Sequence, residues 1–79
     1  MHYAYMLESQ SSPGSFYVGS TGDLKRRLND HNCGRSAHTA MQKPWTLSTY
    51  VAFSDRLKAL RFERYMKSGS GREFAKRHF

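Results

Sequence analysis

The stretch HYAYMLESQSSPGSFYVG, residues 2–19, decides the fold that we expect for this chain. Aromatic and aliphatic side chains alternate over residues 2–8, which predicts a β-strand. Residues 11–15 combine serine, proline and glycine, the residue types that favour a turn. Residues 16–19 then predict a second short strand, so we expect the two strands to pair as a β-hairpin with a loop longer than the tightest types.

The sequence after the hairpin predicts helices arranged around one more strand. Residues with side-chain oxygens stand where the helices begin, and glycine or proline stands where they end. The expected elements are a helix over 23–32 capped by Thr21 or Asp23, a short helix over 36–42, a strand over 45–53, a helix that is capped by Ser54 and runs to about Lys67, and a short final helix opened by Ser70 and Glu73 as a capping box.

This order of elements predicts an α/β fold with a small three-stranded, mostly antiparallel sheet flanked by helices. A sheet of this size is stable only when other elements cover it. The 79 residues fit one domain, residues 1–79, because a chain of this length buries only about 60% of its unfolded surface and supports a single thin core.

The chain is strongly basic, with 13 Lys and Arg against 6 Asp and Glu and a net charge of +7. Such a charge attracts polyanions, because contacts between basic side chains and phosphates release counterions. Nucleic acid is therefore the expected partner. A merely soluble basic protein, or one that docks on ribosomes or acidic proteins, would have the same composition. Basicity does not distinguish DNA from RNA, or binding from cleavage.

Nothing in the composition points to a membrane or to an oxidising compartment. No apolar run approaches the roughly 18 residues that a membrane span needs, and the N-terminus lacks the basic and apolar regions of a signal peptide. Cys33 is the only cysteine, so an intramolecular disulfide cannot form. We therefore expect a cytoplasmic protein without a membrane partner.

The expected helix over 23–32 carries two polar residues on its apolar side. At about 100° per residue, Arg27 and His31 share a stripe with two leucines. An inward arginine is costly unless it is paired or faces a polar cleft, or unless its stem packs while the guanidinium reaches solvent. Periodicity alone weighs these alternatives equally for Arg27, and it favours a hydrogen-bonded packing role for His31.

Two tyrosine segments, Tyr3-Ala4-Tyr5 and Tyr17-Val18-Gly19, are separated by eleven residues. Tyrosine in strands usually serves packing. The order of these segments, however, resembles the paired motif of the GIY-YIG nuclease superfamily, with Tyr3 and Ala4 in place of Gly and Ile. The likeness is greatest to small stand-alone bacterial members, which are related to the catalytic domains of excision-repair and homing endonucleases. It continues in order through residues 24–28, His31-Asn32, Gly34, Thr39, residues 43–45 and residues 59–63.

The resemblance implies a metal-dependent DNA endonuclease that hydrolyses phosphodiester bonds. Tyr17 would act as general base or orient the attacking water, with Tyr5 beside it. A phenol is a poor base at its normal pKa near 10, so a nearby cation would have to favour the phenolate. Arg27 would clamp the scissile phosphate with its planar guanidinium. His31 would assist the base or a phosphate oxygen.

Glu63 is the metal ligand that the resemblance implies, with one Mg²⁺ or Mn²⁺ as cofactor. Hard cations prefer carboxylate oxygen and keep several waters, so one protein ligand can be enough. The ion would neutralise the leaving oxygen. Spacing alone favours another interpretation, because Lys67 stands four residues further along and would form an exposed ion pair. The order of the motifs favours the metal, although the asparagine that many members carry downstream of this glutamate does not occur here.

Basic side chains supply the expected contact with DNA, either duplex or branched, with RNA as the less favoured partner. Recognition would come from DNA shape, a homodimer or a larger repair complex. The alternative function is a nucleic-acid-binding module of the same fold that is catalytically weak or inactive. The residues expected to contact the nucleic-acid backbone are Arg26, Arg56, Arg64, Lys67, Arg72 and Lys76.

Overall fold

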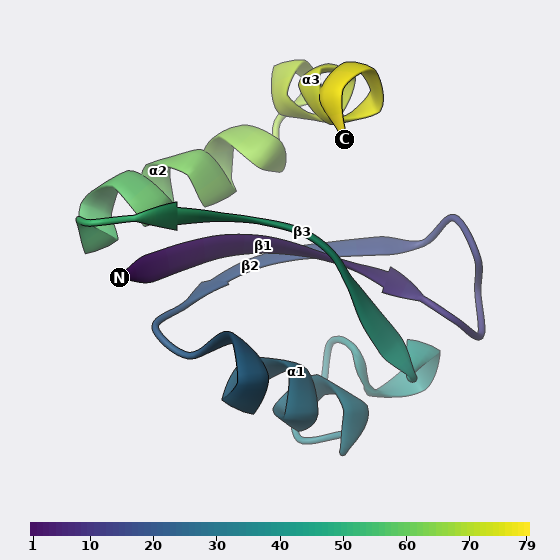
Figure 1. The fold of residues 1–79 in the computed structure, drawn as a ribbon. Coiled ribbons are helices and arrows are strands. Elements are labelled where there is room, and N and C mark those ends of the chain that lie inside the picture. The colour runs from purple at the N-terminus through teal and green to yellow at the C-terminus, as the bar shows by residue number, and fades with distance from the viewer.

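The computed structural model describes all 79 residues and confirms the predicted α/β fold. The sheet is fully antiparallel, with strand order β2-β1-β3. Helix α1 covers one face of the sheet, and α2 and α3 lie on the other face (Figure 1). The elements are β1 (His2–Ser9), β2 (Phe16–Thr21), α1 (Leu24–Asn32), the 3₁₀ turn η1 (Ala40–Gln42), β3 (Trp45–Phe53), α2 (Arg56–Met66) and α3 (Gly69–His78).

The central strand β1 supplies the core, because its alternating side chains reach both helical layers. Tyr5 and Leu7 are buried on the α1 side, where they pack with Trp45 of β3. Two leucines of α1, Leu24 and Leu28, pack against the same cluster, as the predicted helix stripe requires. None of the helices has the length and apolar character that crossing a bilayer demands.

Aspartates, and not the neighbouring hydroxyl residues, cap the first two helices. Asp23 accepts a hydrogen bond from the Arg26 amide at 3.1 Å, while Thr21 accepts one from the Asp23 amide. The prediction that Ser54 caps α2 is wrong by one residue, because the Asp55 carboxylate accepts from the helix amide of Leu57 at 3.0 Å. A carboxylate in this position also interacts favourably with the positive end of the helix dipole.

The final helix begins two residues earlier than predicted. Ser68 is its cap and accepts from the Gly71 amide at 3.1 Å, so the expected capping box of Ser70 and Glu73 is wrong. Gly71 is buried, and a Cβ added there would lie 1.8 Å from the Tyr65 carbonyl oxygen. The absence of a side chain at Gly71 therefore lets α3 restart directly against the end of α2.

The expected helix over 36–42 is also wrong in extent, because only residues 40–42 form a 3₁₀ turn. The preceding residues form turns that bring Thr39 to a fully buried position against His31. A tertiary hydrogen bond thus replaces the regular helical geometry that local sequence favours.

Candidate active site

The residues expected to be catalytic gather at the edge strand β2, between the two helical layers. Tyr5 and Tyr17 come from β1 and β2, with ring centroids 6.4 Å apart. His31 of α1 lies against both rings, with centroid distances of 5.9 Å to Tyr5 and 5.0 Å to Tyr17. Arg27 reaches the same tyrosines from one turn earlier in α1.

Gly19 explains how Tyr5, on the central strand, reaches this edge. The two residues are opposite each other in the β1–β2 register. A Cβ at Gly19 would lie 2.6 Å from the Tyr5 hydroxyl oxygen and 3.1 Å from a ring carbon of Tyr17. Any larger side chain at Gly19 would therefore displace the two tyrosines from their present positions.

His31 is fully buried, and both of its ring nitrogens have hydrogen-bond partners. Nε2 lies 2.9 Å from the Tyr5 hydroxyl, and Nδ1 lies 2.7 Å from the Thr39 hydroxyl. Burial, together with the nearby positive charge of Arg27, lowers the pKa of His31, and Asp30 only partly opposes this shift. The imidazole is therefore held neutral at physiological pH.

Donor counting assigns the protons of this network. Arg27 can only donate, so in its interaction with Tyr5 the phenol oxygen is the acceptor. The Tyr5 hydroxyl then donates to Nε2 of His31, and Nδ1–H donates to Thr39. Thr39 in turn donates to the Ser36 carbonyl, 3.4 Å away. This arrangement leaves no buried polar side-chain atom without a partner, which agrees with the structure as a whole.

Tyr5 and Arg27 influence each other's pKa. Burial raises the pKa of Tyr5, and the hydrogen bond and positive charge of Arg27 oppose that rise only in part. The same hydrogen bond raises the pKa of Arg27, with smaller contributions from the charge and hydrogen bonding of Tyr17. Tyr5 therefore remains a neutral phenol, and Arg27 remains a cation whose side chain is still 36% exposed. That exposure leaves the guanidinium accessible to a phosphate.

Glu63 approaches the site from α2, on the opposite layer. Its negative charge contributes to the raised pKa of Tyr5. The side chain is only 19% exposed and forms an ion pair with Lys67, whose Nζ lies 2.8 Å from a carboxylate oxygen. The same ammonium lies 5.9 Å from the centre of the Tyr17 ring. Glu63, the predicted metal ligand, therefore also forms the predicted ion pair, and the Lys67 ammonium contacts its carboxylate.

The basic residues expected to contact DNA do not form one surface. Arg26 lies on α1, across the sheet from α3, and Arg56 begins α2 at the end remote from α3 (Figure 1). Arg64 is exposed on the last turn of α2 and does not line the groove that separates α3 from the sheet. The three remaining residues line that groove together with Tyr17: Lys67, Arg72 and Lys76.

Three residues have structural roles that sequence reasoning did not assign. Thr39 and Gly19 were only parts of a motif order, yet Thr39 orients His31, and Gly19 provides the space that Tyr5 occupies. Asn32 is similar, because its side-chain amide pairs with both backbone groups of Trp45 and ties α1 to β3. A glycine inside a strand pattern was the one available signal, since it often marks a close approach.

The fold and this cluster define a GIY-YIG catalytic domain, and the chain belongs to that family: the model of the GIY-YIG catalytic domain matches residues 1–77. The predicted resemblance is thereby confirmed. The chain is similar to a UPF0213 protein of Streptococcus agalactiae, at 42% identity over 65 residues, which cover 81% of this chain and 74% of that protein. The solution structure of the UPF0213 protein BH0048 from Bacillus halodurans has a TM-score of 0.56 and 34% identity, covering 95% of this chain and 79% of that chain.

A relative of a different kind is the structure-specific endonuclease subunit SLX1 of Malassezia globosa. It is 40% identical over 67 residues, which cover 80% of this chain but 15% of that protein. The subunit of Schizosaccharomyces pombe is 40% identical over 65 residues, covering 75% of this chain and 24% of that protein. The chain therefore matches a small part of each of these two subunits.

Proposed function

We propose that this chain is a metal-dependent DNA endonuclease that hydrolyses phosphodiester bonds with a Tyr/Arg/Glu site. The observation that carries the proposal is the convergence of Tyr17, Arg27 and Glu63 on one strand edge, although they come from three separate elements. Membership of a catalytic-domain family and similarity to structure-specific endonuclease subunits support it.

Tyr17 and Arg27 act directly on the reacting groups in this proposal. The Tyr17 ring is partly exposed, so its hydroxyl can take a proton from an attacking water or orient that water. Arg27 lies beside the two tyrosines at the same strand edge. The free donors of Arg27 then bind the non-bridging oxygens of the phosphate, where charge increases in the transition state.

Tyr5, His31 and Thr39 are positioning residues. Tyr5 is 4% exposed and His31 is 0% exposed, so neither can contact a phosphate without rearrangement. Their hydrogen bonds fix the Tyr5 ring, and the Tyr5 hydroxyl in turn interacts with the Arg27 guanidinium. The network thereby holds the guanidinium in place before substrate binds, which reduces the reorganisation needed during the reaction.

Glu63 fits a Mg²⁺ or Mn²⁺ ligand. Its carboxylate is mostly shielded from solvent and is already compensated by one cation, the Lys67 ammonium. When bound, the metal supplies charge neutralisation at the leaving oxygen. Lys67 then loses its carboxylate partner, and its long side chain becomes available for a neighbouring phosphate.

Cleavage of a defined set of substrates tests the proposal. The purified protein should cut at least one of duplex, single-stranded, flap or four-way-junction DNA with added Mg²⁺ or Mn²⁺. EDTA should stop the reaction, and Glu63→Gln should abolish it. Absence of cleavage of every substrate with either metal would remove the enzyme assignment.

A catalytically inactive DNA-binding module is the second candidate, and the Glu63–Lys67 ion pair favours it. If this ion pair persists in the presence of millimolar metal, the carboxylate never becomes a ligand. DNA binding that is unchanged by Glu63→Gln, without turnover, would support this candidate.

The remaining assignments follow from the proposed activity. We propose duplex or branched DNA as the substrate class, and the similarity to structure-specific endonuclease subunits supports recognition of DNA by its structure. We further propose that residues 1–79 form a single domain, that it acts in the cytoplasm, and that a homodimer or a larger repair complex supplies specificity.

A further inference from the structure

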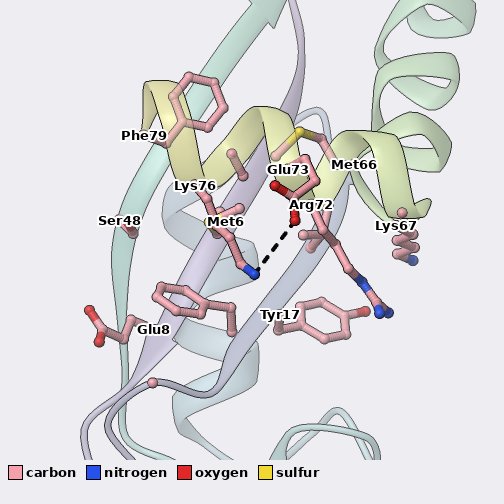
Figure 2. Close-up of a pocket in the computed structure, with 15 residues that line it drawn as sticks. Met6, Glu8, Tyr17, Ser48, Met66, Lys67, Arg72, Glu73, Lys76 and Phe79 are labelled. Carbon is pink, nitrogen blue, oxygen red and sulfur yellow. Dashed lines mark ion pairs between the residues drawn. The ribbon is translucent and has the colours of Figure 1, made fainter.

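A groove beside the catalytic cluster has no role in the reaction steps described above. It has a volume of about 930 Å³, near the upper end of the roughly 300–1,000 Å³ range of pockets that hold a drug-sized ligand. Residues of β1, β2, α3 and the end of α2 line it (Figure 2). Tyr17 lines it, so the groove and the proposed catalytic site share one residue.

The walls of the groove combine apolar surface with accessible aromatic rings. Met6 and Val18 line the groove from the sheet, and Met66 lines it from the last turn of α2. Phe16, at the start of β2, is 52% exposed, and Phe79, after α3, is 48% exposed. Exposed phenylalanines beside a cavity offer flat faces on which a nucleobase can stack.

Positive charge lines the same groove. Figure 2 shows Arg72 and Lys76 extending from α3 toward the sheet. Lys76 is partly compensated by Glu73, 3.7 Å away, and Glu8 is the other acid of the lining. Arg72 has no ion pair, so its guanidinium is free for a phosphate. Lys67 connects this charge to Glu63 at the catalytic cluster.

We propose that this groove binds unpaired nucleotides of a DNA strand, next to the phosphate held at Tyr17 and Arg27. The inference rests on the proposed nuclease function and names its substrate class: DNA with a single-stranded segment at the cut site. An apolar, aromatic wall can stack on a nucleobase only where the face of that base is exposed. In a blunt duplex, neighbouring bases cover those faces. A backbone with phosphates at regular spacing matches Arg72 and Lys76 beside such a wall.

Fluorescence anisotropy in EDTA tests the groove without requiring turnover. The probes are a labelled oligothymidylate of about ten nucleotides, within the usual ~4–16 nucleotide site size, and a blunt duplex of equal length. Phe16→Ala should weaken binding of the single strand by roughly 5- to 150-fold, the effect of losing one stacked base. Arg72→Ala should weaken it and reduce the salt dependence by about 0.7 of a log unit per log unit of salt. Both variants should bind the blunt duplex as the wild type does.

Two matched controls separate this site from general loss of aromatic surface or charge. Tyr50 is as exposed as Phe16, at 53%, but lies on β3 outside the groove. Lys43 lies near Gly34, beyond the end of α1 and away from α3. Tyr50→Ala and Lys43→Ala should leave single-strand affinity near the wild-type value.

Equal behaviour of the groove variants and the controls would overturn the inference, as would equal losses on both probes. Tighter binding of an oligouridylate than of the oligothymidylate would overturn the assignment to DNA. Failure of the nuclease proposal looks different, because single-strand binding through Phe16 and Arg72 would persist without any cleavage in Mg²⁺ or Mn²⁺. Cleavage by the wild type with unchanged single-strand binding by both variants would remove the groove assignment alone.

Discussion

On the α1 side of the sheet, polar groups are buried and fully hydrogen-bonded, whereas on the α3 side they line an open groove. His31 and Thr39 have no exposed surface, and each has a defined partner. Arg72 and Lys76, by contrast, are exposed, and Arg72 has no ion pair. A sealed network fixes geometry before substrate arrives, while an open basic surface can adapt to a flexible chain. Tyr17 lies at the border and contacts both regions.

Among the tests that compare the two sides of the sheet, the largest expected effect comes from removing the cation that lies beside the sealed network. Arg27→Ala should lower the single-turnover rate of DNA cleavage by about 10²- to 10³-fold, as loss of a transition-state donor does elsewhere. Arg35→Ala is the matched control, because Arg35 is exposed and pairs only with Asp30. A rate in Arg27→Ala within the range of the control would place phosphate binding outside the α1 side.

Breaking the sealed network deeper in the fold should reduce stability. In Thr39→Val, the shape is retained but Nδ1–H of His31 loses its acceptor, which should cost about 1–3 kcal/mol of unfolding free energy. Urea denaturation measures this loss. Thr46→Val removes an exposed hydroxyl that accepts from Gln10 Nε2 at 2.9 Å and lies 3.5 Å from the Glu8 carbonyl oxygen. It should have little effect, because water can replace hydrogen bonds at an exposed site. Comparable losses of unfolding free energy in the two variants would mean that the buried hydrogen bonds stabilise the fold no more than exposed ones do.

The neutral state of His31 should make stability fall with acidity. Because folding lowers the pKa of His31, the unfolded chain takes up a proton that the folded chain resists below pH of about 6.5. The contribution is fully present above that pH and is lost progressively as the pH falls below it, with a slope of at most about 1.4 kcal/mol per pH unit. His31→Gln should abolish this slope, and His38→Gln, which changes an exposed imidazole, should retain it.

The smallest expected effect is at the junction of the two regions. Lys67→Met keeps the stem but removes the cation that competes for Glu63, so Mn²⁺ should bind slightly more tightly. An ion pair at this helical spacing is worth about 0.2–0.5 kcal/mol, which corresponds to roughly a twofold change in the dissociation constant. Calorimetric titration with Mn²⁺ measures it, with Lys76→Met as control. Weaker Mn²⁺ binding in Lys67→Met would show that the lysine supports the metal.

The fold was predictable because local patterns and tertiary demands agree in most of the chain. The alternation in β1 fits only a strand, and the leucine stripe of α1 fits only a helix. The sequence therefore predicts both elements and the side of each that faces the core. The predicted helix boundaries were wrong where several residues that can cap a helix are adjacent. Ser54 and Asp55 are equivalent in sequence, and only the hydrogen bond to Leu57 chooses between them.

The candidate site was predictable as a set of residues but not as an arrangement. The motif order named His31, yet its complete burial and its bond to Thr39 depend on turns that local sequence does not specify. The groove was even harder to predict from the sequence. Phe16 and Arg72 are 56 positions apart, and they line the same groove only because α3 folds back over the sheet. A list of basic residues could not tell the three that line the groove from the three that do not.

Single-turnover cleavage by Tyr17→Phe, with DNA affinity measured in EDTA on the same protein, is the most direct test of a tyrosine-centred active site. The substitution removes one hydroxyl and keeps the ring that packs on His31 and Trp45. We expect the Mg²⁺-dependent rate to fall by about 10²- to 10⁴-fold, the usual contribution of a general base, with DNA affinity and folding unchanged. Cleavage by Tyr17→Phe at the wild-type rate would contradict the assignment of the site.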